Sequence, residues 1–361
     1  MILFAAALLL PWCAGAAAPE KGAVPVIFET DMGNDIDDAL ALDLLYKGMD
    51  AGHIRLSGVT NAEAAMEMLM AGATAVGVCT AAIVNGPGVF TQLTENLSKL
   101  MDKYGYPDIP IAYTPRAVDN KDRDYTTPVC ELKASDGKPL FKRSRKPGSW
   151  EDPVAMYRRL LAAEPDNSVV VVSVGFSGNL AALLASDGDD VSPLTGRELV
   201  ARKVKYFSVM AGSFGVKKRA EYNVINDIPA ARKFFAECPS PIVLTPFEIG
   251  KQVVYPGRSI AEDFGWAEHH PMVEAYKAYH EMPYDRPTWD VIATYYVLPH
   301  EPSSLTLSIP GRITVDEQGF IFFTPDKAGQ HRYITASDRQ AGMILGYFLR
   351  ALPERPLRYM R

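Results

Sequence analysis

The sequence predicts an α/β fold with an open, mostly parallel (mixed) central sheet, helices on both of its faces and a C-terminal β-hairpin. Three observations support this prediction. Strand-like and helix-like segments alternate through most of the chain, which is typical of parallel sheets with crossover helices. Residues 168–173 form a nearly continuous apolar run, as in a strand buried on both faces. The 361 residues, 48% of them hydrophobic, suffice for one large domain.

Local patterns predict each element in turn. Short β-branched or continuous apolar runs predict strands at residues 24–28, 54–60, 168–173, 204–210 and 242–245. Helix-like stretches follow three of these strands, at residues 39–47, 62–73 and 180–185. In an open parallel sheet, ligands bind beyond the carboxyl ends of the strands, so candidate site residues are sought there.

Two regions break this alternation. Residues 120–150 are rich in charge, proline and glycine, and are predicted to be a long loop or insertion. Residues 312–315 and 320–323 are predicted to form the hairpin. Because the chain shows no internal repeat and no interdomain linker, residues 19–361 are predicted to form a single domain.

The N-terminus resembles a targeting segment. Residues 2–10 are an unbroken apolar run, and residues 14–18 are all small. This pattern predicts a signal peptide at residues 1–18 and hence an exported protein, periplasmic or secreted. A lipoprotein signal at Cys13 is a weaker alternative, because the bulky Trp12 precedes it. No later apolar stretch has the length of a membrane helix, so no membrane span is expected.

Charge and cysteine content narrow the possible partners. The chain has 37 basic and 43 acidic residues, a net charge of −6, and no Lys/Arg run interleaved with aromatics. A nucleic-acid polymer is therefore not expected as a partner, whereas small molecules are. Beyond the signal peptide, Cys79, Cys130 and Cys238 lack metal-ligand spacing and allow at most one disulfide.

The most informative segment is residues 29–38, between a predicted buried strand and a predicted helix. Its carboxylates are Glu29, Asp31, Asp35, Asp37 and Asp38. Like charges this close raise one another's pKa unless something offsets them. A helix N-terminus can offset one or two of them as solvated caps. Calcium, a hard cation that prefers oxygen ligands, can offset more. From the residues alone, both interpretations stay open.

Two other acidic motifs fit this segment poorly. An EF-hand loop needs a glycine where Ile36 stands and an acidic residue where Leu42 stands. An aspartyl nucleophile of the phosphatase type needs a matching basic and acidic set downstream, and no such set is found.

Ordered motifs resemble those of the inosine-uridine nucleoside hydrolase family. The family's opening turn reads Asp-x-Asp-Pro-Gly-x-Asp-Asp. In this chain Asp31 matches its second aspartate, Asp37 and Asp38 match its closing pair, and Glu29 replaces its first aspartate. The turn has two extra residues and Met32 in the proline position. Further similar blocks follow in the family's order at residues 172–175 with Asn179, 210–212, 220–223, 227–231 and 289–290.

The resemblance implies a calcium-dependent N-ribohydrolase that splits the bond between ribose and base. It implies that Asp31, Asp38 and Asp290 bind Ca²⁺ through carboxylates and Val174 through its carbonyl. It further implies that Asp37 activates the calcium-bound water as general base. The chemistry is consistent, because carboxylates stabilise the positive charge that develops on the ribose in the transition state. The role of Asp35, in the inserted part of the turn, is unassigned.

The resemblance also implies a ribose pocket. Glu221 and Asn223 would hydrogen-bond the ribose hydroxyls, Met210 would line the sugar pocket, and Asn61 would add a further ribose contact. Trp289 stands where many family members have a histidine linked to activation of the leaving base, and its indole can stack but cannot supply an acid proton. A substitute acid is left open among His53, His269, His270, His280, His300, His331, Tyr284, Asp285 and Arg286.

Three functions are therefore weighed. The first is a nucleoside hydrolase of purine or pyrimidine salvage, which family analogy makes a homodimer or homotetramer. The second is a hydrolase of another ribosyl or glycosyl compound on the same fold. The third is a non-catalytic, calcium-dependent protein that binds a sugar or nucleoside. Taken singly, each site residue has a plainer interpretation, such as a helix N-cap for Asp290 or core packing for Met210.

Overall fold

The central sheet is built around β1 (Val24–Thr30), whose side chains alternate between two buried layers. The computed structural model describes residues 22–31, 35–61, 108–113, 126–141 and 151–357. Val26 and Phe28 pack into one hydrophobic cluster and Ile27 packs into the other. This alternation follows from the two-residue period of a strand, and it fixes which helices cover each face.

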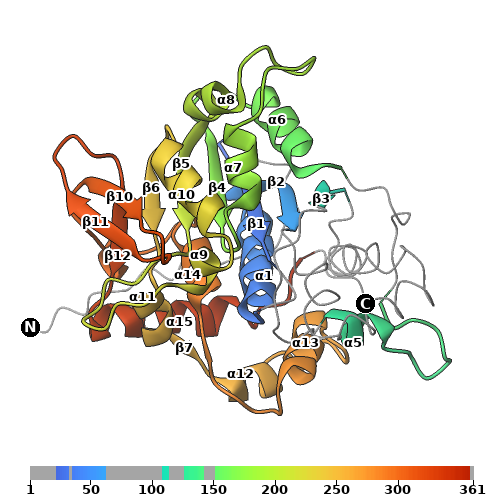
Figure 1. Ribbon diagram of the computed structural model, residues 1–361. Coiled ribbons are helices and arrows are strands. Elements are labelled where there is room, and N and C mark those ends of the chain that lie inside the picture. The colour runs from blue at the N-terminus through green and yellow to red at the C-terminus, as the bar shows by residue number, and fades with distance from the viewer. Residues whose placement is uncertain (1–21, 32–34, 62–107, 114–125, 142–150, 358–361) are drawn as a thin grey trace, which may run out of the picture.

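The sheet is open and mostly parallel, as predicted. Within the described part of the chain its strand order is β3-β2-β1-β4-β5-β6-β12-β9 (Figure 1). The other strands of this sheet are β2 (Ile54–Asn61), β3 (Ile111–Tyr113), β4 (Val169–Ser173), β5 (Val204–Val209), β6 (Ile242–Leu244), β9 (Thr306–Leu307) and β12 (Arg332–Thr335). Only the pairing of β12 with β9 is antiparallel.

Helices cover both faces of this sheet (Figure 1). One hydrophobic cluster contains α1 (Asp37–Asp50), α13 (Pro271–Tyr279), α14 (Trp289–Tyr295) and α15 (Asp338–Ala351). The other contains α6 (Pro153–Ala163), α7 (Gly178–Leu184), α8 (Gly196–Lys203) and α10 (Ile228–Glu237). The smaller elements are α5 (Thr126–Glu131), α9 (Tyr222–Ile225), α11 (Phe247–Gln252), α12 (Gly257–Glu262), η2 (Pro302–Ser304), β7 (Val254–Tyr255) and β8 (Arg286–Pro287).

The chain order places a crevice at the carboxyl end of β1. From β1 the chain proceeds outward to β2 and β3, and then returns to β4 on the other side of β1. Connections that diverge from neighbouring strands in this way leave a ligand crevice at their carboxyl ends. The acidic turn therefore lies at the expected binding edge of the sheet.

The predicted elements compare closely with the observed ones. Each predicted strand is present, and the hairpin is confirmed as β10 (Gly311–Val315) and β11 (Ile321–Pro325). Gly319 in its turn has a φ of +81°, a conformation that glycine adopts without strain. The helix predicted at residues 62–73 lies outside the described residues. The predicted loop at 120–150 needs correction, because α5 lies inside it. No helix in the described part of the chain could cross a membrane.

Candidate active site

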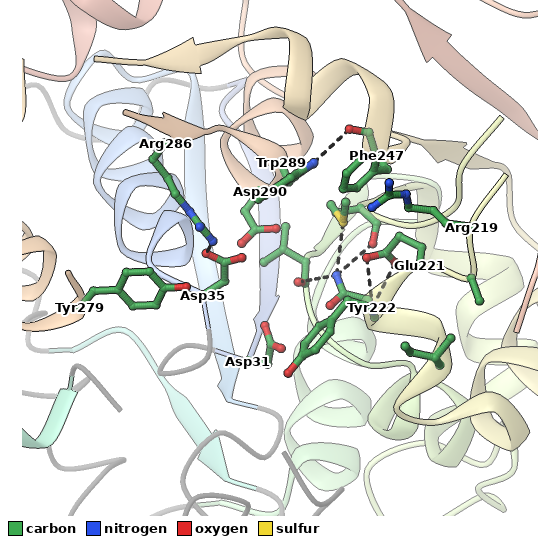
Figure 2. A pocket seen from close by; sticks show the side chains of 15 residues that line it. Asp31, Asp35, Arg219, Glu221, Tyr222, Phe247, Tyr279, Arg286, Trp289 and Asp290 are labelled. Atoms are coloured by element: carbon green, nitrogen blue, oxygen red, sulfur yellow. Dashed lines mark hydrogen bonds and ion pairs between the residues drawn. The ribbon is translucent and has the colours of Figure 1, made fainter. Parts of the chain in front are cut away.

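A cavity of about 370 Å³ lies at the carboxyl ends of β1, β4 and β5. It is lined by residues that lie far apart in the sequence, among them the carboxylates Asp31, Asp35, Glu221 and Asp290 (Figure 2). Its volume is that of a typical small-ligand site. Of the predicted site residues, Asp31, Val174, Met210, Glu221, Asn223, Trp289 and Asp290 all line this cavity.

Asp37 and Asp38 lie in the first turn of α1 and are completely buried. Helix α1 packs against α14, and the backbone N–H of Asp290 donates to Asp37 Oδ2 at 3.0 Å. Thr30 Oγ1 donates to Asp38 Oδ1. The packing of these two helices therefore brings Asp290, more than 250 residues along the chain, next to the acidic turn.

Burial and mutual repulsion make the charged forms of these carboxylates unfavourable in free energy. Burial is the main cause that raises the pKa values of Asp37, Asp38 and Asp290, and the charges of neighbouring aspartates raise them further. Among the described residues, Asp37 Oδ1 and Asp38 Oδ2 have no hydrogen-bond partner. A cluster of buried acids with unsatisfied oxygens is the signature of a site that awaits a cation or ligand.

Helix capping does not explain these carboxylates. The N-cap residue of α1 is Ile36 and that of α14 is Thr288, and neither cap makes a side-chain hydrogen bond. Asp37 and Asp38 do lie at a helix N-terminus, as the plainer interpretation expects, but they are buried and not solvated, and Asp290 is not an N-cap. Asp37 and Asp38 are fully buried, and Asp290 is nearly so and lines the cavity.

The donor set suits a hard cation, although its atoms do not enclose one as they lie. Carboxylates and a backbone carbonyl are the oxygen ligands that calcium prefers. Val174 O lines the cavity and accepts a hydrogen bond of 2.9 Å from Asn223 Nδ2, which leaves one lone pair available. In the described ranges, no three His, Cys, Asp or Glu side chains converge closely enough to hold a metal.

An arginine partly neutralises the turn. Arg286, from β8, forms an ion pair with Asp35, and its Nε lies 3.9 Å from Asp37 Oδ1. The guanidinium lies over the rings of Tyr279 and Trp289, at 5.2 and 5.3 Å from their centroids. Arg286 was one of the residues considered for the leaving-group acid, and the structure places it beside the inserted part of the acidic turn instead (Figure 2).

Glu221 and Asn223 lie together on the opposite wall of the cavity. Glu221 is the N-cap of α9, and both of its carboxylate oxygens accept from the backbone N–H of Asn223. Burial, with a contribution from the charges of Asp31 and Asp35, raises the pKa of Glu221 to about 8. The side chain of Asn223 bridges the carbonyls of Val174 and Met210. The loop thus ties the ends of β4 and β5 together.

Two further residues complete the carboxyl end of β1. Asn61 is the last residue of β2 and pairs with Thr30, and its side chain lies outside the described part of the structure. Glu29 is buried and accepts a hydrogen bond from Tyr157, and burial raises its pKa to about 8. A Cβ at Gly175 would lie 2.8 Å from the backbone nitrogen of Asp31, so only glycine allows the β4 turn to approach the acidic turn.

Trp289 is anchored by packing. Its ring stacks on Phe247, with centroids 5.4 Å apart, and its Nε1 donates to Phe247 O at 2.9 Å. Its indole N–H is therefore donated within the protein and is not available to a leaving base. No described histidine lines the cavity, and neither Tyr284 nor Asp285 does. Tyr284 donates to Tyr276 O, and Asp285 accepts from Gly257 N.

Sequence reasoning did not identify several cavity residues: Arg219, Ala220, Tyr222, Ile225, Phe247 and Tyr279. Arg219 and Tyr222 flank Glu221, and Phe247 follows the carboxyl end of β6, so proximity to a motif or strand end could have identified these three. Tyr279 ends α13, and no local sequence signal indicates its position in the site.

Several solved structures share the fold. A purine-preferring ribonucleoside hydrolase from Gardnerella vaginalis is 16% identical, with a TM-score of 0.62 over 91% of this chain and 98% of that one. A plant nucleoside hydrolase is 20% identical, with a TM-score of 0.60 over 90% and 98%. An inosine-uridine preferring nucleoside hydrolase from Bacillus anthracis is 16% identical, with a TM-score of 0.60 over 91% and 99%.

A short segment resembles a different protein. Over 52 residues, 14% of this chain, it is 54% identical to the catalytic subunit of dihydroorotate dehydrogenase B from Streptococcus pneumoniae serotype 4. The match spans only 16% of that protein, so the similarity is confined to a segment.

The family model for the inosine-uridine preferring nucleoside hydrolases matches residues 26–341, which is most of the chain. The match extends from β1 to the start of α15 and so includes every element that lines the cavity. The chain belongs to the inosine-uridine preferring nucleoside hydrolase family and is a hydrolase that acts on N-glycosyl compounds.

Proposed function

We propose that this chain hydrolyses ribonucleosides to ribose and free base, using Ca²⁺ and Asp37 as general base. The observation that supports this most strongly is that Asp31, Asp290 and Val174 line one cavity, and that the backbone N–H of Asp290 donates to the buried Asp37. Buried carboxylates that raise one another's pKa do not favour stability, because each one costs free energy in its charged form. A bound cation and a cationic transition state both offset that cost.

The carboxylates of Asp31, Asp38 and Asp290 and the carbonyl of Val174 would hold the calcium. When bound, the cation would orient the ribose diol and lower the pKa of a coordinated water. Asp38 Oδ2 is available for this role, because it accepts no hydrogen bond from any described residue. Arg286 holds Asp35 to one side of the cavity, so it limits the contribution of Asp35 to the ligand set.

The chain's own residues supply the remaining steps. Asp37 takes the proton of the attacking water through Oδ1, while the N–H of Asp290 holds Oδ2. Glu221 and Asn223 bind ribose hydroxyls from the opposite wall. The C1′–N bond breaks as the water oxygen bonds to C1′, and the departing base takes up a proton. Hydrogen-bond donors that line the cavity and can stabilise that base are Tyr222 and Tyr279.

A second function is favoured by the anchored Trp289 and by a cavity that no described histidine lines. It is hydrolysis of another ribosyl or glycosyl compound, whose leaving group needs no strong acid. In this alternative the aspartates keep their roles and only the leaving group differs. A non-catalytic binding protein is the third alternative, and it would need calcium but no general base.

A reducing-sugar assay of the purified protein tests the function. The substrates are inosine, uridine, adenosine, cytidine and a nitrophenyl riboside, each with calcium and with chelator. The expected result is calcium-dependent release of ribose from a nucleoside. Release from the nitrophenyl riboside alone would favour the second function. If calcium binds but ribose is released from none of them, nucleoside hydrolysis is contradicted and a binding role is favoured.

We also propose that residues 1–18 are removed on export and that residues 19–361 form a single catalytic domain. The apolar run and the small residues before Pro19 support this proposal. Mass spectrometry of the protein from the culture medium or periplasm should give a mature N-terminus at Pro19. Size-exclusion chromatography with light scattering would test the homodimer or homotetramer expected from family analogy.

A further inference from the structure

A second hollow adjoins the active-site cavity. Its volume is about 410 Å³, and the loop before α9 and the helix α11 line it with Lys217, Arg219, Phe247, Glu248 and Lys251. We refer to it as the basic groove. Arg219 and Phe247 line both the basic groove and the active-site cavity. A substituent that leaves the cavity past Arg219 therefore enters the basic groove directly.

The cations of the basic groove are solvent-exposed and form no ion pair with a described carboxylate. Lys217, Arg219 and Lys251 are exposed. None of them takes part in an ion pair with a carboxylate in the described part of the chain. The protein as a whole carries a net charge of −6, so this positive patch contrasts with its overall charge. Such a local field attracts anionic ligands.

The one carboxylate of the groove is bound by its own loop. Ser213 Oγ donates to Glu248 Oε1 at 2.5 Å, and the backbone N–H groups of Gly215 and Phe214 donate at 2.9 and 3.2 Å. Burial alone would raise the pKa of Glu248, but these hydrogen bonds hold it below its usual value. Glu248 is thus satisfied by the loop, and the groove keeps a surplus of positive charge.

Aromatic stacking orders the arginine at the junction of the two hollows. Arg219 Cζ lies 4.0 Å from the centroid of Phe247, and Phe247 in turn stacks on the anchored Trp289. Lys251 Nζ lies 5.8 Å from the same Phe247 ring. A stacked guanidinium presents a planar fork of donors that matches phosphate geometry. Figure 2 shows Arg219 across the cavity from Asp35 and Arg286, on the same side as Glu221.

We propose that the preferred substrates are nucleosides that carry a phosphate on the ribose, with the phosphate in the basic groove. Arg219 binds it at the junction, and Lys217 and Lys251 bind it from the two walls of the groove. The inference rests on the proposed function and extends it, because a neutral nucleoside makes no use of these unpaired cations. The reaction stays a hydrolysis: the C1′–N bond breaks, water supplies the new C1′–O bond, and the products are a ribose phosphate and the base.

The test compares kcat/KM for inosine with inosine 5′-monophosphate, and for uridine with uridine 5′-monophosphate, in calcium. We expect the phosphorylated compound to be preferred by about tenfold or more, because each charge-assisted hydrogen bond contributes strongly. The double variant Lys217→Gln with Lys251→Gln should lower this ratio by about tenfold. The matched control is Lys205→Gln. Lys205 is an exposed lysine at the amino end of β5, away from the carboxyl end where the cavity lies, so its substitution should leave the ratio unchanged.

The outcomes separate the two proposals. Hydrolysis of inosine with a phosphate preference of one or below overturns the basic-groove proposal and leaves the proposed function intact. A preference that survives in the double variant also overturns it, because the phosphate then binds elsewhere. If none of the four compounds is hydrolysed, the proposed function itself is overturned. The preference should also fall with added salt, because exposed cations are screened.

Discussion

The acidic turn after β1 and the loop after α7 both contain aspartates, but the charges of these aspartates are offset in different ways. Asp189 lies in this loop, and the buried Arg158 of α6 donates two hydrogen bonds to its carboxylate, of 2.7 and 3.0 Å. It also donates to the carbonyls of Ser192 and Leu194, both at 2.9 Å. In the turn, by contrast, carboxylates repel one another, and two of their oxygens accept no hydrogen bond from the described residues.

The direction of the pKa shifts reflects this difference. Hydrogen bonds from Arg158, and then from the backbone N–H of Ser192, hold the pKa of Asp189 below its usual range. Burial and neighbouring aspartates raise the pKa values of Asp37 and Asp38. The same residue type is therefore stabilising in one region and destabilising in the other. We infer that the loop's charges serve the fold, whereas the turn's charges are kept for a ligand.

The largest expected effect is that of Asp37→Asn on turnover. Loss of the general base should lower kcat by about 10³-fold while the affinity for a nucleoside changes little. In chelator the variant should unfold at a higher temperature than the wild type, because one buried charge of a repelling cluster is gone. The matched control, Asp189→Asn, should keep its kcat and unfold at a lower temperature. Retained turnover in Asp37→Asn would contradict the assignment of the base.

The second effect is on stability. Arg158→Met removes the buried cation and leaves the carbonyls of Ser192 and Leu194 without that donor. The expected loss in the free energy of unfolding is about 1–2 kcal/mol, measured by urea denaturation, with kcat/KM unchanged, because carbonyls lose a donor while the carboxylate of Asp189 stays partly exposed to water. A loss below about 0.5 kcal/mol would show that the loop does not depend on the pairing of Arg158 with Asp189. The contrast between this loop and the acidic turn would then be wrong.

A smaller effect concerns pH. Because the pKa of Glu221 is raised from 4.5 to about 8, the folded protein keeps a proton there that the unfolded chain releases. This contribution to stability is complete below the unfolded pKa and is lost as pH rises through the folded one. Glu221→Gln imitates the protonated acid. In chelator, its melting temperature should match the wild type near about pH 5 and exceed it near about pH 9. A constant difference across this range would contradict the shift.

Much of the fold followed from local patterns. The apolar runs at β4 and β6 are continuous because both faces of these strands are covered, and together with the alternation of strand-like and helix-like segments they predicted a parallel sheet. The helix α5 was not predicted, because its six residues lie in a segment whose proline, glycine and charge favour a loop. Packing against α13 holds it in place, and packing is not visible in a local pattern.

The site was predictable where its residues lie in motifs and unpredictable where long-range packing positions them. Asp31, Glu221 and Asp290 are parts of motif blocks, and the structure brings all three into one cavity. Arg286 and Tyr279 enter that cavity only because the segment from α13 to β8 folds back over the acidic turn. The pairing of Arg286 with Asp35 depends on this tertiary arrangement, and neither residue alone indicates it.

Calorimetric titration of Ca²⁺ into the chelator-treated protein tests the central claim most directly. If the buried carboxylates of the turn are kept for calcium, the wild type should bind Ca²⁺ at a saturable site. Asp38→Asn and Asp290→Asn should each weaken that binding by about 100-fold or more, because each removes a charged ligand, while Asp189→Asn should bind like the wild type. Binding that is absent in the wild type, or equally strong in all the variants, would contradict the account.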